Sequence, residues 1–225
     1  MASWIVHLRI ADRLLDRIPR LKKTEFVVGN IAPDSGIPNE DWSAYTPSSV
    51  ISHFKPNDAV PKTIQISLFT ARHFSEEQRA GYSPAEFSFF LGYLVHLLTD
   101  QLWSSQVAGA LQNRFPERWT ADKRALIREA KEDWYDLDFL YLKKHPAFRS
   151  FVIYENAVGF QNTFMDIFSS NAFDNRRAYI VSFYRQENDR LDREYPYLTE
   201  EQMNLFVQDA ADQILYRLKQ EYGVA

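Results

Sequence analysis

Residues 83–103 read SPAEFSFFLGYLVHLLTDQLW, and this stretch decides the class of fold. It opens with Ser83 as an N-cap, Pro84 at the first helical position and Glu86 three residues after the cap, which predicts that a helix begins here. The residues that follow are apolar around nearly the whole circumference of a helical wheel. Because such a helix is buried among other elements, the sequence predicts a central helix.

His96 and Asp100 interrupt this apolar run. They are four residues apart, so they project from the same face of the helix. An imidazole and a carboxylate that are buried together need a partner, because an unpaired buried charge is very costly. The spacing alone leaves two partners open: a neighbouring cation in a structural core pair, or a metal ion.

Three more residues of these types fall at the ends or in the middle of apolar segments. His7 lies within the apolar stripe of a helix expected over residues 3–18. Asp34 follows an apolar stretch that ends in a turn, and His53 lies in a second loop segment. Each residue taken singly fits a structural role. Taken together, imidazoles and carboxylates are the ligands of a hydrolytic zinc, iron or manganese site, and the chain has no Cys to offer a thiolate.

Composition limits the class of protein. The 225 residues, of which 15% are aromatic, are enough for one globular domain over residues 1–225. A net charge of −4 gives no electrostatic footprint for duplex nucleic acid. The chain opens directly into an amphipathic helix, and its longest apolar run is short for a membrane span of about 20 residues. We therefore expect a soluble, cytoplasmic protein without a transmembrane segment; its oligomeric state stays open.

The rest of the sequence predicts further helices and no convincing strand. Residues 30–62 form a long polar excursion in which Trp42 and Tyr45 are expected anchors, and a loop of this length inside a compact domain is usually functional. A Thr199–Gln202 capping box begins the last helix. The helices are expected over residues 63–74, 120–144, 147–169, 171–192 and 199–222.

The ordered set of His7, Pro33-Asp34, Ser52-His53-Phe54 and Gly92 to Asp100 resembles the superfamily of zinc-dependent phospholipase C and single-strand-specific nucleases. The resemblance implies an all-α, multi-helix bundle that holds a metal cluster. It also implies a ligand set in which Asp34, His53, His96 and Asp100 bind one metal. His7 and Asp100 would bind a second, with Asp100 as the bridge.

The chain departs from the family pattern at several ligand positions. Secreted members begin with a mature Trp that binds metal, whereas Trp4 is internal, and Gln106 stands where a further His is usual. A later helix that normally supplies H-x-x-x-E or H-x-x-x-D instead carries Glu132-Asp-Trp-Tyr-Asp-Leu-Asp138. Asp133, or else Asp136 or Asp138, would complete a depleted site of one or two metals. The alternative is that these acids form a solvated rim.

The predicted function is that of a metal-dependent phosphoric-ester hydrolase, phospholipase C-like or a phosphodiesterase, that uses a metal-activated water. Asp34 would ligate the metal and also accept a proton from the water. The cofactor is expected to be a divalent ion, zinc first, with iron or manganese as alternatives. The partner is a small phosphoester or a phospholipid headgroup. The competing hypothesis is a non-catalytic helical binding or scaffolding module with a structural metal site.

Overall fold

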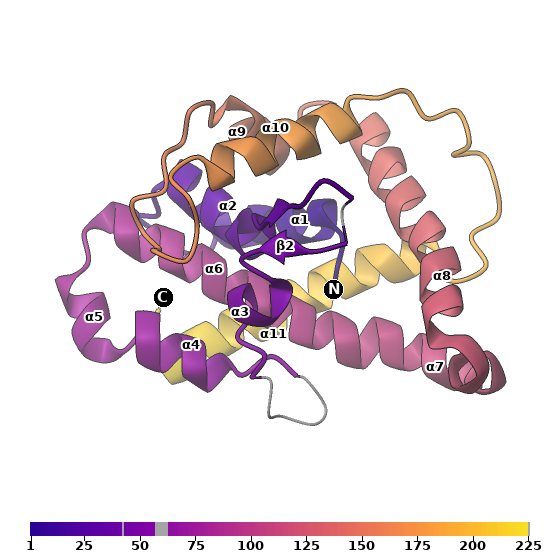
Figure 1. The fold of residues 1–225 in the computed structure, drawn as a ribbon, viewed down its shortest axis with the longest axis horizontal. Helices are drawn as coiled ribbons and strands as arrows, with labels where there is room; N and C mark the ends of the chain where they lie inside the picture. Colours follow the sequence, from indigo (N-terminus) through magenta and orange to yellow (C-terminus); the bar gives the residue numbers. More distant parts are fainter. Residues whose placement is uncertain (42, 57–62, 225) are drawn as a thin grey trace.

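The computed structural model describes residues 1–41, 43–56 and 63–224, and most of them are helical (Figure 1). The only strands among these residues are β1 (Ile37–Pro38) and β2 (Tyr45–Thr46), which pair antiparallel in a short hairpin. The all-α fold class predicted from the sequence is therefore confirmed. The α-helices are α1 (Trp4–Leu15), α2 (Lys23–Ile31), α3 (Ser49–Ser52), α4 (Ile66–His73), α5 (Glu76–Gly81), α6 (Pro84–Leu102), α7 (Gly109–Arg114), α8 (Pro116–Lys144), α9 (Arg149–Asn156), α10 (Ala172–Tyr184) and α11 (Glu200–Tyr222), with a 3₁₀ turn at Ala32–Asp34 and a π-helical segment at Trp103–Ala108.

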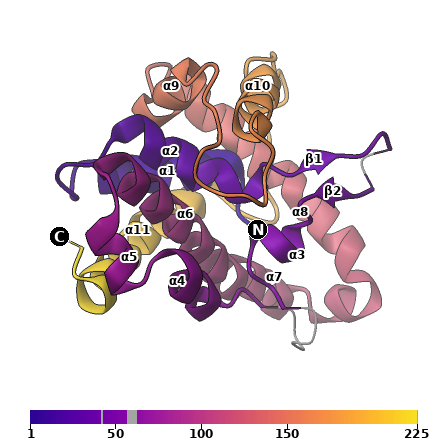
Figure 2. The same ribbon diagram turned by 60° about the vertical axis from the view of Figure 1, so that its left-hand side comes forward.

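Helix α6 is the centre of the bundle, as its sequence predicts. Every residue from 88 to 100 is buried, and α6 contacts α1, α2, α4 and α11. Figures 1 and 2 show α6 with α2 along one side and α11 behind it, while α9 and α10 cover one end of the molecule. The Ser83 capping box is present: Ser83 Oγ accepts from the Glu86 amide, and Glu86 Oε2 accepts from the Ser83 amide. The Thr199–Gln202 box that begins α11 is also present.

Two glycines bring the backbones of α2 and α6 into direct contact. A Cβ on Gly29 would lie 2.2 Å from the Phe89 carbonyl oxygen, and a Cβ on Gly92 would lie 2.2 Å from the Phe26 carbonyl oxygen. Any side chain at either position would therefore push the helices apart. This contact between the two backbones sets how close to α6 the end of α2 holds Asn30 and the turn that follows it.

The segment predicted as a long excursion over residues 30–62 is more ordered than expected. Its described part contains the end of α2, the 3₁₀ turn, the hairpin and α3. Asn39 closes the hairpin loop, because its amide donates to the Ala44 carbonyl and its Oδ1 accepts from the Ala44 amide. Tyr45 lies on β2 and is half-exposed, while Trp42 lies outside the described residues.

Helix boundaries differ from the sequence predictions where side chains bond the backbone. The helix expected over 147–169 ends at Asn156, and an irregular segment follows. There Asn162 Nδ2 donates to the Met165 and Phe168 carbonyls, and Asn162 Oδ1 accepts from the Phe164 and Met165 amides. These bonds give the backbone an alternative to helix.

Three other boundaries were placed wrongly from the sequence. Helix α8 begins at Pro116 rather than at residue 120, and it is broken at Asp122, whose side chain accepts from the Ala125 amide. Helix α1 ends at Leu15 and α10 ends at Tyr184. In each case the sequence pattern predicted the helix but not the residue at which it begins or ends, because helix ends are less sharply defined than helix interiors.

Candidate metal centre

Three imidazoles and two carboxylates from four separate segments converge in the core. His96 and Asp100 come from α6, His7 comes from α1, Asp34 ends the 3₁₀ turn, and His53 follows α3. All three imidazoles and Asp100 are buried. The sequence had singled out these same five residues, and the structure brings them together.

Asp100 lies among the three imidazoles. Its Oδ1 is 3.5 Å from His7 Nε2, while its Oδ2 is 3.5 Å from His53 Nε2 and 3.7 Å from His96 Nε2. The amide of Ala2 donates to Oδ1 at 2.8 Å. The two carboxylate oxygens therefore face different histidines, which is the arrangement that a bridging carboxylate requires.

Hydrogen bonds orient two of the histidines. His96 Nδ1 lies 2.8 Å from the Asn30 carbonyl, which can only accept, so Nδ1 carries the proton and the Nε2 lone pair faces the cluster. His53 Nδ1 lies 3.0 Å from Ser52 Oγ. The Nε2 atoms of His53 and His96 are 3.2 Å apart. A metal-ligating histidine usually bonds a backbone or polar group through its other nitrogen in this way.

The cluster contains buried polar atoms without a hydrogen-bond partner among the described residues. These atoms are both ring nitrogens of His7 and Oδ2 of Asp100. Since such orphaned atoms are costly, their convergence fits a cation that the side chains would satisfy. Two groups have ligand atoms within 4.8 Å of one another: His7, His96 and Asp100 in one, and Asp34, His53 and His96 in the other.

The ionisation states also suit metal ligation. Burial, followed by the nearby His7, lowers the pKa of His96 to about 3, so this imidazole is neutral at pH 7. Burial opposes ionisation of Asp100 and Asp34, but the adjacent imidazoles outweigh it, and the pKa of each carboxyl lies below its ordinary value. Neutral imidazole and ionised carboxylate are the forms that bind divalent metals.

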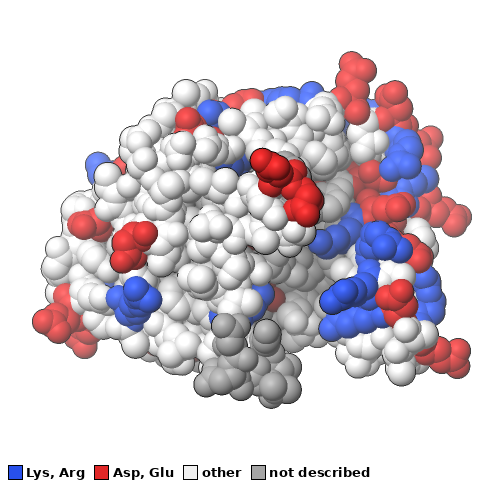
Figure 3. Space-filling model, in the orientation of Figure 1, with Lys and Arg blue, Asp and Glu red and all other residues white. Residues whose placement is uncertain are grey.

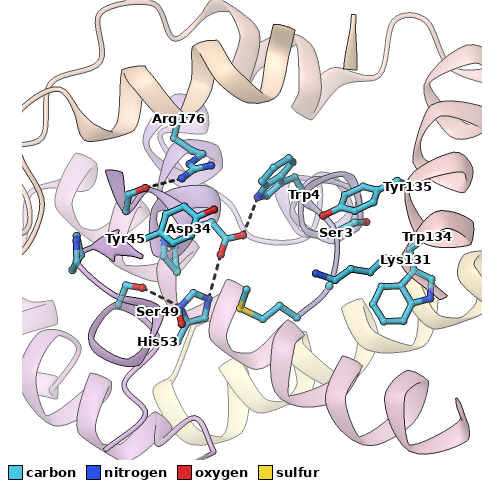
Figure 4. Close-up of a pocket in the computed structure, with 16 residues that line it drawn as sticks. Ser3, Trp4, Asp34, Tyr45, Ser49, His53, Lys131, Trp134, Tyr135 and Arg176 are labelled. Atoms are coloured by element: carbon cyan, nitrogen blue, oxygen red, sulfur yellow. Dashed lines mark hydrogen bonds and ion pairs between the residues drawn. The ribbon is translucent and has the colours of Figure 1, made fainter. Parts of the chain in front are cut away.

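Asp34 connects this cluster to a cavity of about 230 Å³ that it helps to line. Its Oδ1 is 3.4 Å from His53 Nε2, and its Oδ2 accepts a hydrogen bond of 2.9 Å from the indole Nε1 of Trp4. Figure 4 shows both interactions of Asp34, with Arg176 from α10 and Lys131 from α8 on different sides of it. The side chain of Asp34 retains 12% exposure, so it is the acid of the cluster that is open to a ligand.

The structure does not bring Asp133 into either group. Asp133 Oδ1 accepts from Arg193 at 2.7 Å, and its Oδ2 accepts from the Tyr197 and Leu198 amides. Asp136 is bound to the same arginine. Asp133 and Asp136 therefore lie in neither group and form no solvated rim, because they are buried and anchor the segment that precedes α11.

Asp138 is a separate buried acid. Its carboxylate accepts hydrogen bonds from Ser3 Oγ at 2.8 Å and from Tyr184 Oη at 2.6 Å. Burial raises the pKa of Asp138 to about 7, although these two bonds and the charge of Arg9 act in the opposite direction. The hydrogen bond from Ser3 to Asp138 holds the first residues of the chain against α8.

Sequence reasoning missed the residues that position the ligands. Trp4 was considered only as a displaced metal ligand, whereas its indole fixes Asp34. Asn30 orients His96 through its backbone carbonyl. Because every residue has a backbone carbonyl, the type of residue at position 30 does not reveal this role. The available signal was a glycine inside each of two apolar helical segments, Gly29 and Gly92, since glycine in a helix interior is destabilising unless packing requires it.

The fold and this cluster define an all-helical protein with a buried His/Asp group that could hold metal. Residues 6–103 match the sequence family described as zinc dependent phospholipase C. The match covers less than half of the chain, yet it includes all five residues of the cluster. The predicted resemblance to that family is thereby confirmed. Together with the His/Asp cluster, it supports a metal-dependent, phospholipase-like role. No curated protein and no solved structure matches the chain.

In the part of the chain that the structure describes, no helix has both the length and the apolar character needed to cross a bilayer.

Proposed function

We propose that the protein is a metal-dependent phosphoric-ester hydrolase, with zinc as the first candidate metal. The observation that carries this proposal is the convergence of orphaned buried ligand atoms, on His7 and Asp100, next to an open cavity reached through Asp34. A structural metal site is closed by protein ligands, whereas a catalytic site keeps an accessible side. The exposed edge of Asp34, at 12% of its side chain, therefore favours catalysis over a scaffolding role.

The two ligand groups suggest one or two metal positions. His7 and Asp100 would hold one ion, and Asp34, His53 and His96, together with Asp100, would hold the other. The opposed orientation of the two Asp100 oxygens supports the assignment of Asp100 as the bridge. Imidazole with carboxylate suits zinc, and also iron or manganese.

The chain's own residues would carry the remaining chemistry. A bound divalent metal would supply Lewis acidity toward the phosphoryl group and toward a nucleophilic water. Asp34 is ionised at neutral pH, and its Oδ1 faces the cluster while Trp4 holds its Oδ2. We propose that Asp34 both ligates the metal and accepts the proton of the water.

The cavity limits the size of the substrate. Its volume of about 230 Å³ is below the roughly 300–1,000 Å³ of sites that enclose a drug-sized ligand. A phosphoryl group with a small headgroup fits, while a long acyl chain would have to remain outside. The proposed substrates are therefore a phospholipid headgroup or a small phosphodiester.

Metal analysis coupled to hydrolysis tests the proposal. Protein purified without chelator is assayed for zinc, iron and manganese, and then for hydrolysis of a panel of 4-nitrophenyl phosphodiesters before and after chelation. We expect bound metal and chelator-sensitive hydrolysis, both lost in His53→Ala and in His96→Ala with the helical circular dichroism spectrum retained. Metal that is retained without any hydrolysis would favour the scaffolding hypothesis, and full metal retention in both variants would remove these residues from the site.

A further inference from the structure

The cavity beside Asp34 is lined by two cationic side chains, Lys131 and Arg176. They come from different helices, α8 and α10, and Figure 4 shows them on different sides of Asp34. Among the described lining residues Asp34 is the only carboxylate, and it already interacts with His53 and Trp4. The charges that remain without a counter-charge in this cavity are therefore positive.

Arg176 is buried without an acid partner. Its Nη2 donates to the Gly36 carbonyl at 2.7 Å, and no ion pair joins Arg176 to any described carboxylate. A guanidinium has five N–H donors, so most of its donor capacity is available to a ligand. The residue is only 7% exposed, which fixes the guanidinium at the wall of the cavity.

Three aromatic rings beside the cavity are occupied by Arg176. Its guanidinium carbon lies 6.0 Å from the ring centroid of Trp4, 5.9 Å from that of Tyr45 and 5.5 Å from that of Tyr179. Aromatic faces arranged in this way are what a quaternary ammonium ligand would use. Because an internal cation holds that position, a cationic headgroup would meet a like charge there.

Lys131 completes the arrangement from the opposite wall. It is exposed, and within the described residues its ammonium group has no ion-pair or hydrogen-bond partner. Figure 4 shows the side chain directed into the cavity. In Figure 3, Lys and Arg side chains also gather over α7 and α8, whereas much of the left-hand part of this face carries no charge.

We infer that Lys131 and Arg176 select an anionic substrate, that is, a phosphoester whose headgroup carries a second negative charge rather than a quaternary ammonium. This inference rests on the proposed function and specifies its substrate class. The second anionic group would bind between the two cations while the phosphoryl group faces the cluster behind Asp34. Charge-assisted hydrogen bonds from the guanidinium and the ammonium would supply the recognition.

Three diesters with the same 4-nitrophenolate leaving group isolate the headgroup charge. The second alcohol is choline, its uncharged isostere 3,3-dimethylbutanol, or 3-hydroxypropanoate. For the zinc-loaded protein we expect kcat/KM to rise in that order. The carboxylate ester should exceed the choline ester by at least about fivefold, the scale of one partly exposed ion pair.

Variants identify the residues responsible. Lys131→Met and Arg176→Met should each reduce the ratio of carboxylate to choline ester, while Lys123→Met, on the same helix but outside the cavity lining, should keep it. Arg176→Met also removes the hydrogen bond to the Gly36 carbonyl, and this loss would disturb the hairpin if that bond supports it. Lys131 is exposed, so Lys131→Met should not disturb the fold, and its result decides the question. A preference for the choline ester, or an unchanged ratio in Lys131→Met, would overturn the inference.

A binding measurement separates this inference from the proposed function. If none of the three diesters is hydrolysed, the proposed function fails. Titration calorimetry of the metal-loaded protein with phosphorylcholine, 3,3-dimethylbutyl phosphate and the phosphate monoester of 3-hydroxypropanoate still measures headgroup selection. Tighter binding of the carboxylate monoester, weakened in Lys131→Met, would support the inference. Equal binding of all three would contradict it.

Discussion

The imidazole rings of His7 and His96 stack in parallel, with their centroids 3.8 Å apart and their planes at 2°. One ring is on α1 and the other on α6, and both direct Nε2 toward Asp100, at 3.5 Å and 3.7 Å. Two charged imidazoles in this position would repel each other, and His7 contributes to the lowered pKa of His96. The stack therefore keeps a nitrogen lone pair available for a metal in the middle of a hydrophobic core.

The first prediction concerns Asp100 and His7. Because the two oxygens of Asp100 face different histidines, Asp100→Asn should lower metal content at both proposed positions, whereas His7→Ala should affect only one. Metal stoichiometry by elemental analysis, measured beside hydrolysis, checks this order. If His7→Ala proves the more damaging variant, or Asp100→Asn keeps the wild-type metal content, Asp100 is not the bridge.

The second prediction concerns the contact between α2 and α6. A methyl group at Gly92 would lie 2.2 Å from the Phe26 carbonyl oxygen and 2.8 Å from the Asn30 amide nitrogen. Gly92→Ala should therefore destabilise the protein by about 1–3 kcal/mol, and it should weaken metal binding because the Asn30 carbonyl orients His96. Urea unfolding and metal titration measure the two effects. Gly81→Ala, where a Cβ meets nothing within 4 Å, is the control and should not lower either quantity.

The third prediction concerns pH and Asp138. Its pKa is raised from 3.8 to about 7 in the folded protein, so the folded state holds a proton that the unfolded state releases. Its contribution to stability is therefore fully present below pH 4 and is lost as the pH rises to about 7, by at most about 1.4 kcal/mol per pH unit. Asp138→Asn should remove this loss.

Urea unfolding of wild type, Asp138→Asn and Asp209→Asn at pH 5 and pH 7.5 tests the effect of Asp138. Asp209 is an exposed acid, and its variant should follow the wild type. The stability difference between Asp138→Asn and the wild type should shift in favour of the variant at pH 7.5. A difference that does not change with pH would show that Asp138 titrates at an ordinary value.

The fourth prediction concerns the salt bridges of Arg193. Arg193→Ala would leave the buried carboxylates of Asp133 and Asp136 without their cation, which should cost about 3–5 kcal/mol. Arg185→Ala breaks a more exposed pair with Glu155 and should cost about 1 kcal/mol or less. Neither variant should change metal content. Loss of metal in a folded Arg193→Ala protein would instead tie Asp133 to the metal centre.

The sequence by itself determined the helical class and the central helix, and it singled out the five residues that the structure brings together, His7, Asp34, His53, His96 and Asp100. Periodicity and capping are local properties, so the start of α6 at Pro84 and of α11 at Glu200 could be predicted from a few adjacent residues. The polar residues inside apolar segments, such as His7 and His96, were equally visible, because a buried titratable group stands out against its neighbours.

Only the tertiary structure decided which of these residues meet and what surrounds them. Asp133 and Asp34 are both acids beside apolar segments, yet one binds Arg193 and the other borders the cavity, because their surroundings come from distant parts of the chain. The cationic pair in that cavity, Lys131 and Arg176, is likewise separated by 45 positions in the sequence. Such relationships depend on how helices pack, as in the backbone contact of α2 with α6 at Gly29 and Gly92, and no local pattern of hydrophobicity encodes that packing.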